Sequence, residues 1–267
     1  MAADSGVDFS RSVMIGRQEL HLDVPTLQRL LREHGHALAN AEQIVEQARG
    51  YAEPLLELLG ADEVQSIDAS DFEGATLVLD LNRPVPEHVL KRFTLVIDSG
   101  SLEHIFDFPT AIRSCMEMVI LGGHVVVITP MNNLTGHGLY QFSPDLFYRI
   151  FAHENGFEIE AMVAFEARPR APWYAVADPT RLRRRIELRN SWETYLAVQA
   201  RRTQITPIFS SPPQQSDYAA AWAGGPFVDA PTALRRFLRR VLPGPIRRAI
   251  RRGFKSPAFT PFRDRSK

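Results

Sequence analysis

Cysteine is almost absent from this chain, with Cys115 the only one among 267 residues. A single cysteine excludes an internal disulfide and is typical of a reducing compartment. No apolar run approaches the roughly 20 residues that a membrane-spanning helix needs. The N-terminus also lacks a basic start followed by a long apolar block, the pattern of a secretory signal. We therefore expect a cytoplasmic protein in which Cys115 is a small core residue rather than a nucleophile.

Positive charge is unevenly distributed along the chain, although Lys+Arg and Asp+Glu are equal at 31 each. Residues 231–267 contain 12 Lys or Arg and a single acid, Asp264. The preceding residues therefore form an acidic body, with 30 acids against 19 bases. A split of this kind often marks an interaction segment.

Composition divides the chain into three parts. Apolar residues make up 45% of the chain, which is ordinary for a globular protein and excludes wholesale disorder. We predict an α/β domain over residues 1–204, a linker containing Pro, Gly and Ser over 205–230, and a basic amphipathic tail over 231–267. In the tail, apolar residues recur at helical spacing against paired arginines.

Apolar runs that end at acids or turn residues predict alternating strands and helices between residues 12 and 202. The longest predicted helix contains Pro54, which predicts a kink or a break into two helices. A further helix is expected to stop at Gly122-Gly123. The other predicted helices are 25–33, 39–59 and 143–154, and the predicted strands are 12–15, 63–67, 75–79, 94–97, 124–129, 157–165 and 192–200.

The segment 93–132 is the most informative part of the sequence. Its short apolar runs suit strands covered on both faces, and the helix between them makes one βαβ unit. Ligands of such sheets bind beyond the carboxyl ends of the strands. The segment contains, in order, a strand ending at Asp98, the turn Ser99-Gly100-Ser101, the pair Glu103-His104, a helix, Gly122-Gly123 and a strand ending in Thr129-Pro130.

An Asp at a strand end, an LEH turn, and GG before a strand ending in TP together resemble the second half of a class I S-adenosylmethionine-dependent methyltransferase. The resemblance covers about residues 12–202 and is strongest in the second half. It implies a Rossmann-like α/β sheet of seven strands in the order 3-2-1-4-5-7-6, mostly parallel with one antiparallel strand. It also implies S-adenosylmethionine as the cofactor.

Acids that end three successive strands point to a nucleoside ligand. A carboxylate at a strand's carboxyl end can accept hydrogen bonds from both ribose hydroxyls. A single such acid would more often be a turn former or helix cap, but three in series favour a ligand edge. The resemblance implies that Asp68 binds the ribose, that Asp80 and Leu81 lie beside the adenine, and that Asp98, Ser99 and Gly100 lie near the methionine moiety.

The first loop of the predicted sheet departs from the methyltransferase pattern, which usually has several glycines there. Only Gly16 stands at this place, in the sequence MIGRQE. Gly16 could allow the cofactor to approach the backbone, with Arg17 or Gln18 contacting its carboxylate, Arg17 as a charge-assisted pair. Equally, Gly16 could be a plain turn in an impaired site. Both interpretations remain open at this point.

Two histidines are candidates for catalysis. His104 follows the predicted ligand edge, and an imidazole there could take a proton from a substrate near neutral pH, although a capping or packing role is the alternative. Glu103 is expected in the first turn of the next helix. A loop with Asn132, His137, Tyr140 and Gln141 should overhang the same edge and contact substrate, or else be an ordinary surface loop. The other histidines show no metal-ligand spacing, and we predict no metal site.

The basic tail has several interpretations. Its paired arginines and apolar face suit an interfacial helix on an anionic membrane surface, such as the inner face of the membrane. The same charge would also bind nucleic acid nonspecifically or a neighbouring acidic protomer, and a flexible solubilising end is the plain alternative. We favour the lipid surface and predict no specific nucleic-acid binding, because no RNA-binding motif is present.

The sequence thus predicts a cytoplasmic S-adenosylmethionine-dependent methyltransferase that acts on a small-molecule or glycan-like acceptor, with transfer to oxygen. Two other hypotheses remain. One is a methyltransferase-like binding or scaffold protein that has lost catalysis with its glycine loop. The other is a nucleoside-binding enzyme of different chemistry, because a fold does not fix a function.

Overall fold

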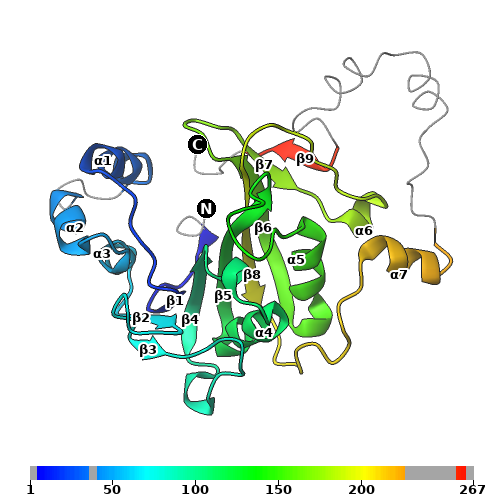
Figure 1. Ribbon diagram of the computed structural model, residues 1–267, viewed down its shortest axis with the longest axis horizontal. Helices are drawn as coiled ribbons and strands as arrows, with labels where there is room; N and C mark the ends of the chain where they lie inside the picture. Colours follow the sequence, from blue (N-terminus) through cyan, green and yellow to red (C-terminus); the bar gives the residue numbers. More distant parts are fainter. Residues whose placement is uncertain (1–4, 36–40, 226–256, 263–267) are drawn as a thin grey trace.

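The computed structural model describes residues 5–35, 41–225 and 257–262, and a nine-stranded mixed sheet forms its centre (Figure 1). The strands are β1 (Arg11–Ile15), β2 (Glu63–Asp68), β3 (Leu77–Val78), β4 (Phe93–Ser99), β5 (Val119–Asn132), β6 (Phe157–Glu166), β7 (Trp173–Val176), β8 (Thr194–Arg202) and β9 (Phe259–Pro261). Their order in the sheet is β3-β2-β1-β4-β5-β8-β6-β7-β9.

Seven of these strands have the predicted order, with β8 as the predicted seventh strand. β1 to β5 are parallel to one another, and β8 is antiparallel to both of its neighbours. The prediction of seven strands with one antiparallel was wrong, because β7 and β9 extend the sheet and β7 is also antiparallel to its neighbours. These two strands have only four and three residues, too few to show a period of two in the sequence.

The helices begin at the capping residues that the sequence provides. The side chain of Asp23 accepts a hydrogen bond from the Thr26 N–H at 2.8 Å and starts the first helix. The predicted helix over 39–59 is two helices, and Pro54 lies in the first turn of the second one. The helices are α1 (Val24–Glu33), α2 (Ala41–Ala48), α3 (Glu53–Leu58), α4 (Phe108–Met118), α5 (Pro144–Ile150), α6 (Pro179–Leu182) and α7 (Ser216–Trp222), with short 3₁₀ turns η3 (Glu87–Val89), η4 (Leu102–His104) and η5 (His153–Asn155).

Both faces of the sheet are covered. In β1, Val13 and Ile15 pack into the main core, whereas Met14 between them packs into a second cluster with Leu56 of α3. The helices α4 and α5 lie over one face, and α1 to α3 lie together near β1 to β3 (Figure 1). Cys115 of α4 is fully buried in the main core, and this burial raises the pKa of its thiol well above the usual value. A thiol kept neutral by burial is inert, as expected for a core residue.

The expected helix stop at Gly122-Gly123 was wrong. Helix α4 ends at Met118, and β5 continues from Val119 straight through both glycines. A Cβ at Gly123 would lie 2.7 Å from the Thr94 carbonyl oxygen, where the pairing of β4 with β5 shifts register. Gly123 is therefore required by the close approach of two strands.

The predicted linker and tail both contain regular structure. Helix α7 lies within 205–230, and β9 lies within 231–267 and pairs with β7. The arginine-rich part of the tail, residues 231–256, falls outside the described residues. The boundary between domain, linker and tail stays a prediction. Within the described part of the chain, no helix is long and apolar enough to cross a membrane.

Candidate functional site

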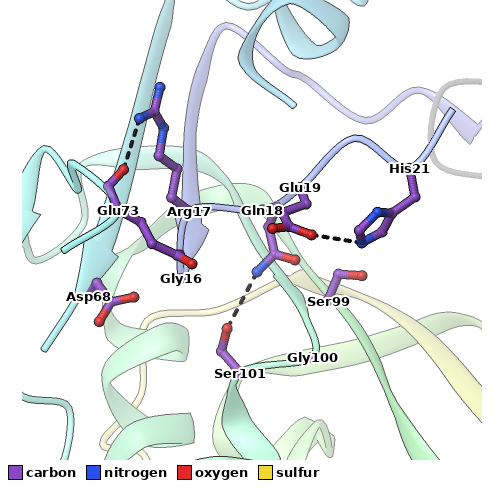
Figure 2. Close-up of a pocket in the computed structure, with 10 residues that line it drawn as sticks. All are labelled: Gly16, Arg17, Gln18, Glu19, His21, Asp68, Glu73, Ser99, Gly100 and Ser101. Atoms are coloured by element: carbon purple, nitrogen blue, oxygen red, sulfur yellow. Dashed lines mark hydrogen bonds and ion pairs between the residues drawn. The ribbon is translucent and has the colours of Figure 1, made fainter. Parts of the chain in front are cut away.

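A cavity of about 250 Å³ opens beyond the carboxyl ends of β1, β2 and β4 (Figure 2). This is the edge at which open parallel sheets bind ligands. The lining groups are mostly polar or charged, and they come from the turn after β1, the end of β2 and the turn after β4. The lining residues are Gly16, Arg17, Gln18, Glu19, His21, Asp68, Glu73, Ser99, Gly100 and Ser101.

Gly16 makes the turn that opens the cavity. Its φ is +68°, a conformation that disfavours side chains, and its N–H donates to the Ile67 carbonyl at 2.7 Å. A Cβ at Gly16 would lie 2.4 Å from Ser101 Oγ, which in turn donates to the Ile15 carbonyl at 2.7 Å. Gly16 is thus more than an ordinary turn, because it lets the ends of β1 and β4 come together.

Arg17 is held by contacts within the protein. Its Nε lies 2.7 Å from Glu53 Oε1, and its Nη1 donates to the Glu73 carbonyl at 2.9 Å. Its guanidinium also lies 3.9 Å from the centre of the Tyr51 ring. The predicted pairing of Arg17 with a ligand carboxylate would therefore have to compete with Glu53.

The three strand-end acids lie in three different environments. Asp68 lines the cavity, as predicted, and its Oδ1 accepts from the Ser70 N–H at 3.3 Å. Asp80 instead lines a second cavity of about 300 Å³ next to Arg83, and Leu81 is buried in the core. Hydrogen bonds from Asn82 lower the pKa of Asp80. The structure does not bring Asp80 and Leu81 to the cavity that contains Asp68.

Asp98 is fully buried and supports the turn that follows it. Its Oδ1 accepts hydrogen bonds from the N–H groups of Ser101 and Leu102, both at 3.1 Å. Burial, followed by the nearby Glu103 carboxylate, raises the pKa of Asp98 well above its usual value. Asp98 therefore shapes the wall that Ser99, Gly100 and Ser101 form, rather than lining the cavity itself.

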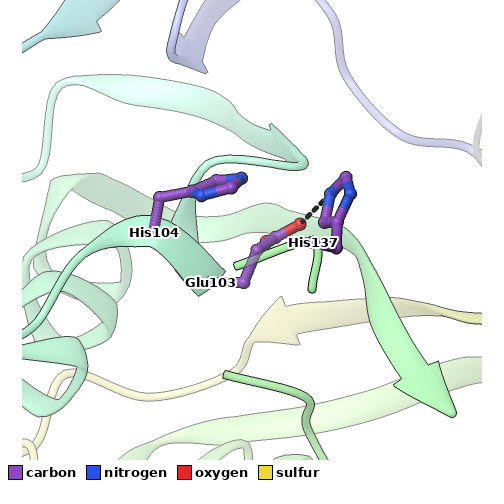
Figure 3. Close-up of side chains that lie close together, drawn as sticks. All are labelled: Glu103, His104 and His137. Carbon is purple, nitrogen blue, oxygen red and sulfur yellow. Dashed lines mark ion pairs between the residues drawn. The ribbon is translucent and has the colours of Figure 1, made fainter. Parts of the chain in front are cut away.

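A second polar group lies beside the cavity and consists of Glu103, His104 and His137 (Figure 3). The Glu103 side chain is fully buried, and its Oε2 accepts from Thr129 Oγ1 at 3.2 Å. Its Oε1 lies 3.4 Å from His137 Nε2, and the two histidine rings are 5.4 Å apart between centroids. A Cβ at Gly100 would lie 3.7 Å from Glu103 Oε1, so this group adjoins the cavity wall.

Glu103 lies in the first turn of a short 3₁₀ helix and not in the first turn of α4. It lies in η4, and α4 begins at Phe108 with Asp107 as its cap. His104 ends η4 with an exposed side chain, so it does not cap α4. The pairing of Glu103 with His137, from loops more than thirty residues apart, depends on the fold and has no local signal in the sequence.

The loop that carries His137 is tied to Glu103. The Glu103 carbonyl accepts from the N–H groups of Leu139 and Tyr140, at 2.9 Å and 3.1 Å. The other loop residues expected to contact substrate instead make internal contacts. The Tyr140 hydroxyl donates to the Phe106 carbonyl at 2.7 Å, the Leu134 N–H donates to Gln141 Oε1 at 2.8 Å, and Asn132 Nδ2 donates to Asn190 Oδ1 at 2.9 Å. His137 is the loop residue that joins the polar group.

Sequence reasoning missed several residues of the cavity. Ser101 holds the ends of two strands together, and Glu73 binds Arg17 through its carbonyl. Ser101 lies in the turn Ser99-Gly100-Ser101, which follows a predicted strand. Its position in that turn could therefore have indicated that it lines the cavity. Glu73 acts through its backbone, which no side-chain pattern reveals.

No protein-family model matches this chain, and no curated protein matches it in sequence. Several solved structures with a similar arrangement of elements have TM-scores of 0.36–0.40 and identities of 9–17%. A branched-chain polyamine synthase mutein from Thermus thermophilus, in complex with N4-aminopropylspermidine and 5'-methylthioadenosine, has a TM-score of 0.40 and 14% identity, with 81% of this chain and 57% of that chain covered. This chain therefore spans little more than half the length of that enzyme.

Two further structures are methyltransferases by name. The N-methyltransferase NodS from Bradyrhizobium japonicum WM9, in complex with S-adenosyl-L-homocysteine, has a TM-score of 0.37 and 12% identity, with 73% of this chain and 79% of that chain covered. A SAM-dependent methyltransferase from Thermotoga maritima has a TM-score of 0.39 and 12% identity, with 75% of this chain and 86% of that chain covered.

Proposed function

We propose that this protein is an S-adenosylmethionine-dependent methyltransferase. The observation that carries the proposal is the cavity at the ends of β1, β2 and β4, where Gly16 makes a close turn and Asp68 projects a carboxylate. The strand order β3-β2-β1-β4-β5-β8-β6 supports the proposal, because the cavity lies at the carboxyl ends of the central parallel strands, the edge at which the sequence resemblance implies the cofactor.

The residues of the cavity suit this cofactor in two respects. Asp68 can accept hydrogen bonds from ribose hydroxyls. The acids Glu19, Asp68 and Glu73 outnumber Arg17, whose charge is shared with Glu53, and a negative surface favours the cationic sulfonium and ammonium groups. Ser99 and Gly100 form the opposite wall, so they are the proposed contacts of the methionine moiety, with Asp98 behind them.

S-adenosylmethionine supplies a methyl group whose bond to sulfur breaks, with its electron pair left on sulfur, as a bond to the acceptor forms. The chain aligns the two reactants. The polar group beside Gly100 can take the acceptor's proton or bind its oxygen. His104 and His137 are the proposed acceptor-side residues. Each imidazole could either take a proton directly or bind an ion that activates the acceptor.

The acceptor is proposed to be a small molecule or a glycan-like compound that is methylated on oxygen. Support comes from the exposure of both histidines, in the polar group that adjoins the cavity wall at Gly100, because a hydroxyl needs a neighbouring group to remove its proton as the methyl arrives.

Calorimetric titration with S-adenosylmethionine and S-adenosylhomocysteine tests the proposal. We expect saturable 1:1 binding of both ligands. Asp68→Ala should weaken the affinity by roughly tenfold or more, because it removes the carboxylate that accepts hydrogen bonds from the two ribose hydroxyls. Asp71→Ala is the matched control, since Asp71 is exposed and does not line the cavity. If the wild-type protein bound neither ligand at millimolar concentration, the proposal that it is a methyltransferase would be rejected.

The contacts of Arg17 favour a second candidate, a methyltransferase-like binding or scaffold protein. An arginine already neutralised by Glu53 contributes little to a ligand carboxylate. If neither cofactor form binds to a folded wild-type protein, this second function is the one that remains. The same titration therefore decides between the two.

For the basic tail we propose an anionic membrane surface as partner, which would make a cytoplasmic protein peripheral at the inner membrane face. The proposal rests on its 12 basic residues and its apolar spacing. Flotation with vesicles that contain phosphatidylserine should recover the wild type and lose a variant with Arg247, Arg248, Arg251 and Arg252 replaced by Gln. Equal recovery of both proteins would exclude the lipid surface.

A further inference from the structure

We propose that Glu103, His104 and His137 bind one divalent transition-metal ion beside the cavity. Each residue offers one ligand atom, and these atoms lie within 4.8 Å of one another (Figure 3). The three come from η4 and from the loop after β5, so the fold brings them together. This proposal departs from the sequence-based prediction of no metal site, which rests on the absence of metal-ligand spacing among the other histidines.

The distances suit a small coordination sphere. Two ligands at about 2.1 Å from a tetrahedral ion lie about 3.4 Å apart. His137 Nε2 and Glu103 Oε1 are 3.4 Å apart without any ion between them. The His104 side chain is exposed, so a rotation about its own bonds can bring its nitrogen to the same centre.

Glu103 gives an independent indication. A fully buried carboxylate is costly unless each oxygen has a partner. Oε2 accepts from Thr129 Oγ1, whereas Oε1 accepts no hydrogen bond from the described residues. Oε1 faces His137 across the gap where the ion would lie (Figure 3). A cation at this point would compensate the buried negative charge.

The surroundings fix the ligands in the way that metal sites require. Thr129 orients the Glu103 carboxylate, and the Glu103 carbonyl holds the His137 loop through Leu139 and Tyr140. Such supporting contacts commonly change metal affinity by roughly 10–100-fold. The ligand atoms are therefore positioned by other contacts rather than by the ion alone.

The ligand set selects the class of ion. Two imidazoles and one carboxylate suit Zn²⁺, Fe²⁺, Co²⁺ or Ni²⁺, whereas Mg²⁺ prefers oxygen ligands alone. Three protein ligands leave at least one coordination position open, as in catalytic sites. The His137 side chain is 38% exposed, so the open position can reach solvent and an acceptor.

A metal ion here would change the chemistry proposed for the histidines. A nitrogen that binds the ion cannot also take a proton, so the ion would bind the acceptor oxygen and lower its pKa instead. The released proton would then pass to solvent. Metal binding itself does not depend on the proposed methyltransferase function, and the two can be tested separately.

The test uses full-length, untagged, metal-free protein. Titration with Co²⁺ should produce visible absorption bands that saturate at one ion per chain, and Zn²⁺ should abolish them by competition. Mg²⁺ should bind at least about 100-fold more weakly than Co²⁺, because it dehydrates reluctantly and disfavours nitrogen ligands. Saturation only at several ions per chain would overturn the proposal.

Variants identify the ligands. His104→Ala and His137→Ala should each weaken Co²⁺ binding by at least tenfold and alter the absorption bands. His88→Ala, at an exposed histidine outside the group, is the matched control and should change neither. Unchanged affinity in the His104→Ala/His137→Ala double variant would overturn the site. Both histidines are exposed, and thermal melting confirms that the variants fold.

The outcomes are independent of cofactor binding. Co²⁺ binding without S-adenosylmethionine binding would retain the metal site and reject the methyltransferase. The reverse result would retain the methyltransferase and reject the metal site, leaving His104 and His137 as proton acceptors.

Discussion

On the Gly16 side of the candidate site the arginine Arg17 is already paired with Glu53, whereas the Glu103 side contains a buried carboxylate with one oxygen that accepts no hydrogen bond from the described residues. On the first side, Arg17 is satisfied by Glu53 and by a backbone carbonyl, so a ligand must compete with existing contacts. On the second side, Oε1 of Glu103 gains a partner when a cation arrives. The side that contains the recognisable LEH turn is therefore also the side where a buried carboxylate oxygen lacks a hydrogen bond from the described residues.

The strand-end acids give the same lesson on a smaller scale. Asp68, Asp80 and Asp98 have equivalent places in the sequence pattern, yet one lines the cavity, one is exposed beside Arg83, and one is buried. A strand-end position therefore predicts where an acid lies but not whether a ligand can reach it.

The largest effect is expected from Gly16→Ala. The new Cβ would meet Ser101 Oγ at a residue with φ of +68°, so the unfolding free energy should fall by about 2–5 kcal/mol and cofactor binding should be lost. Urea denaturation and calorimetry measure the two effects. Gly35→Ala has a similar φ of +73° but no described atom within 4 Å, so it should lose only about 1–2 kcal/mol. Equal losses would mean that the contact with Ser101 is unimportant.

On the Glu103 side, Gly138→Ala should cost about 1–3 kcal/mol of stability, because its Cβ would lie 3.0 Å from the Glu103 carbonyl oxygen. The same displacement should weaken Co²⁺ binding by moving His137. Gly136→Ala lies in the same loop with no atom within 4 Å and should change neither quantity. If the two variants behaved alike, the loop would not be tied to Glu103 in solution.

Asp98→Asn should alter the pH dependence of stability. The pKa of Asp98 is raised in the folded state, so its stabilising contribution is present below the unfolded pKa of about 4 and is lost as pH rises through the folded pKa. The Asn variant keeps an oxygen for the N–H groups of Ser101 and Leu102 but cannot ionise. Its unfolding free energy relative to wild type should therefore increase by about 1 kcal/mol or more between pH 4 and pH 8. Parallel urea-denaturation profiles would contradict this.

The smallest effect is expected from Asp80→Ala. Asp80 lines a separate cavity, so cofactor affinity measured by calorimetry should change by less than about threefold, against tenfold or more for Asp68→Ala. A loss equal to that of Asp68→Ala would show that both cavities serve one ligand. It would then support the adenine contact that the sequence resemblance implies.

The central strands were predictable because apolar runs in β1, β4 and β5 are buried on both faces and end at acids or turns, whereas their order in the sheet was implied only by the family resemblance. The edge strands were not, because β7 and β9 are too short to carry a pattern. Asp68 could be placed at the cavity from its strand alone. The contact of Glu103 with His137 could not, because it depends on how the loop after β5 folds back over η4.

The strand β9 has a consequence for the sheet edge. It pairs with β7 through Phe259, Thr260 and Pro261, and Phe259 is buried against the core. A chain truncated before β9 would leave β7 as an unpaired edge next to the partly exposed Trp173. Exposed edge strands recruit other chains, so such a truncation should self-associate. We therefore expect β9 to protect this edge of the sheet against self-association.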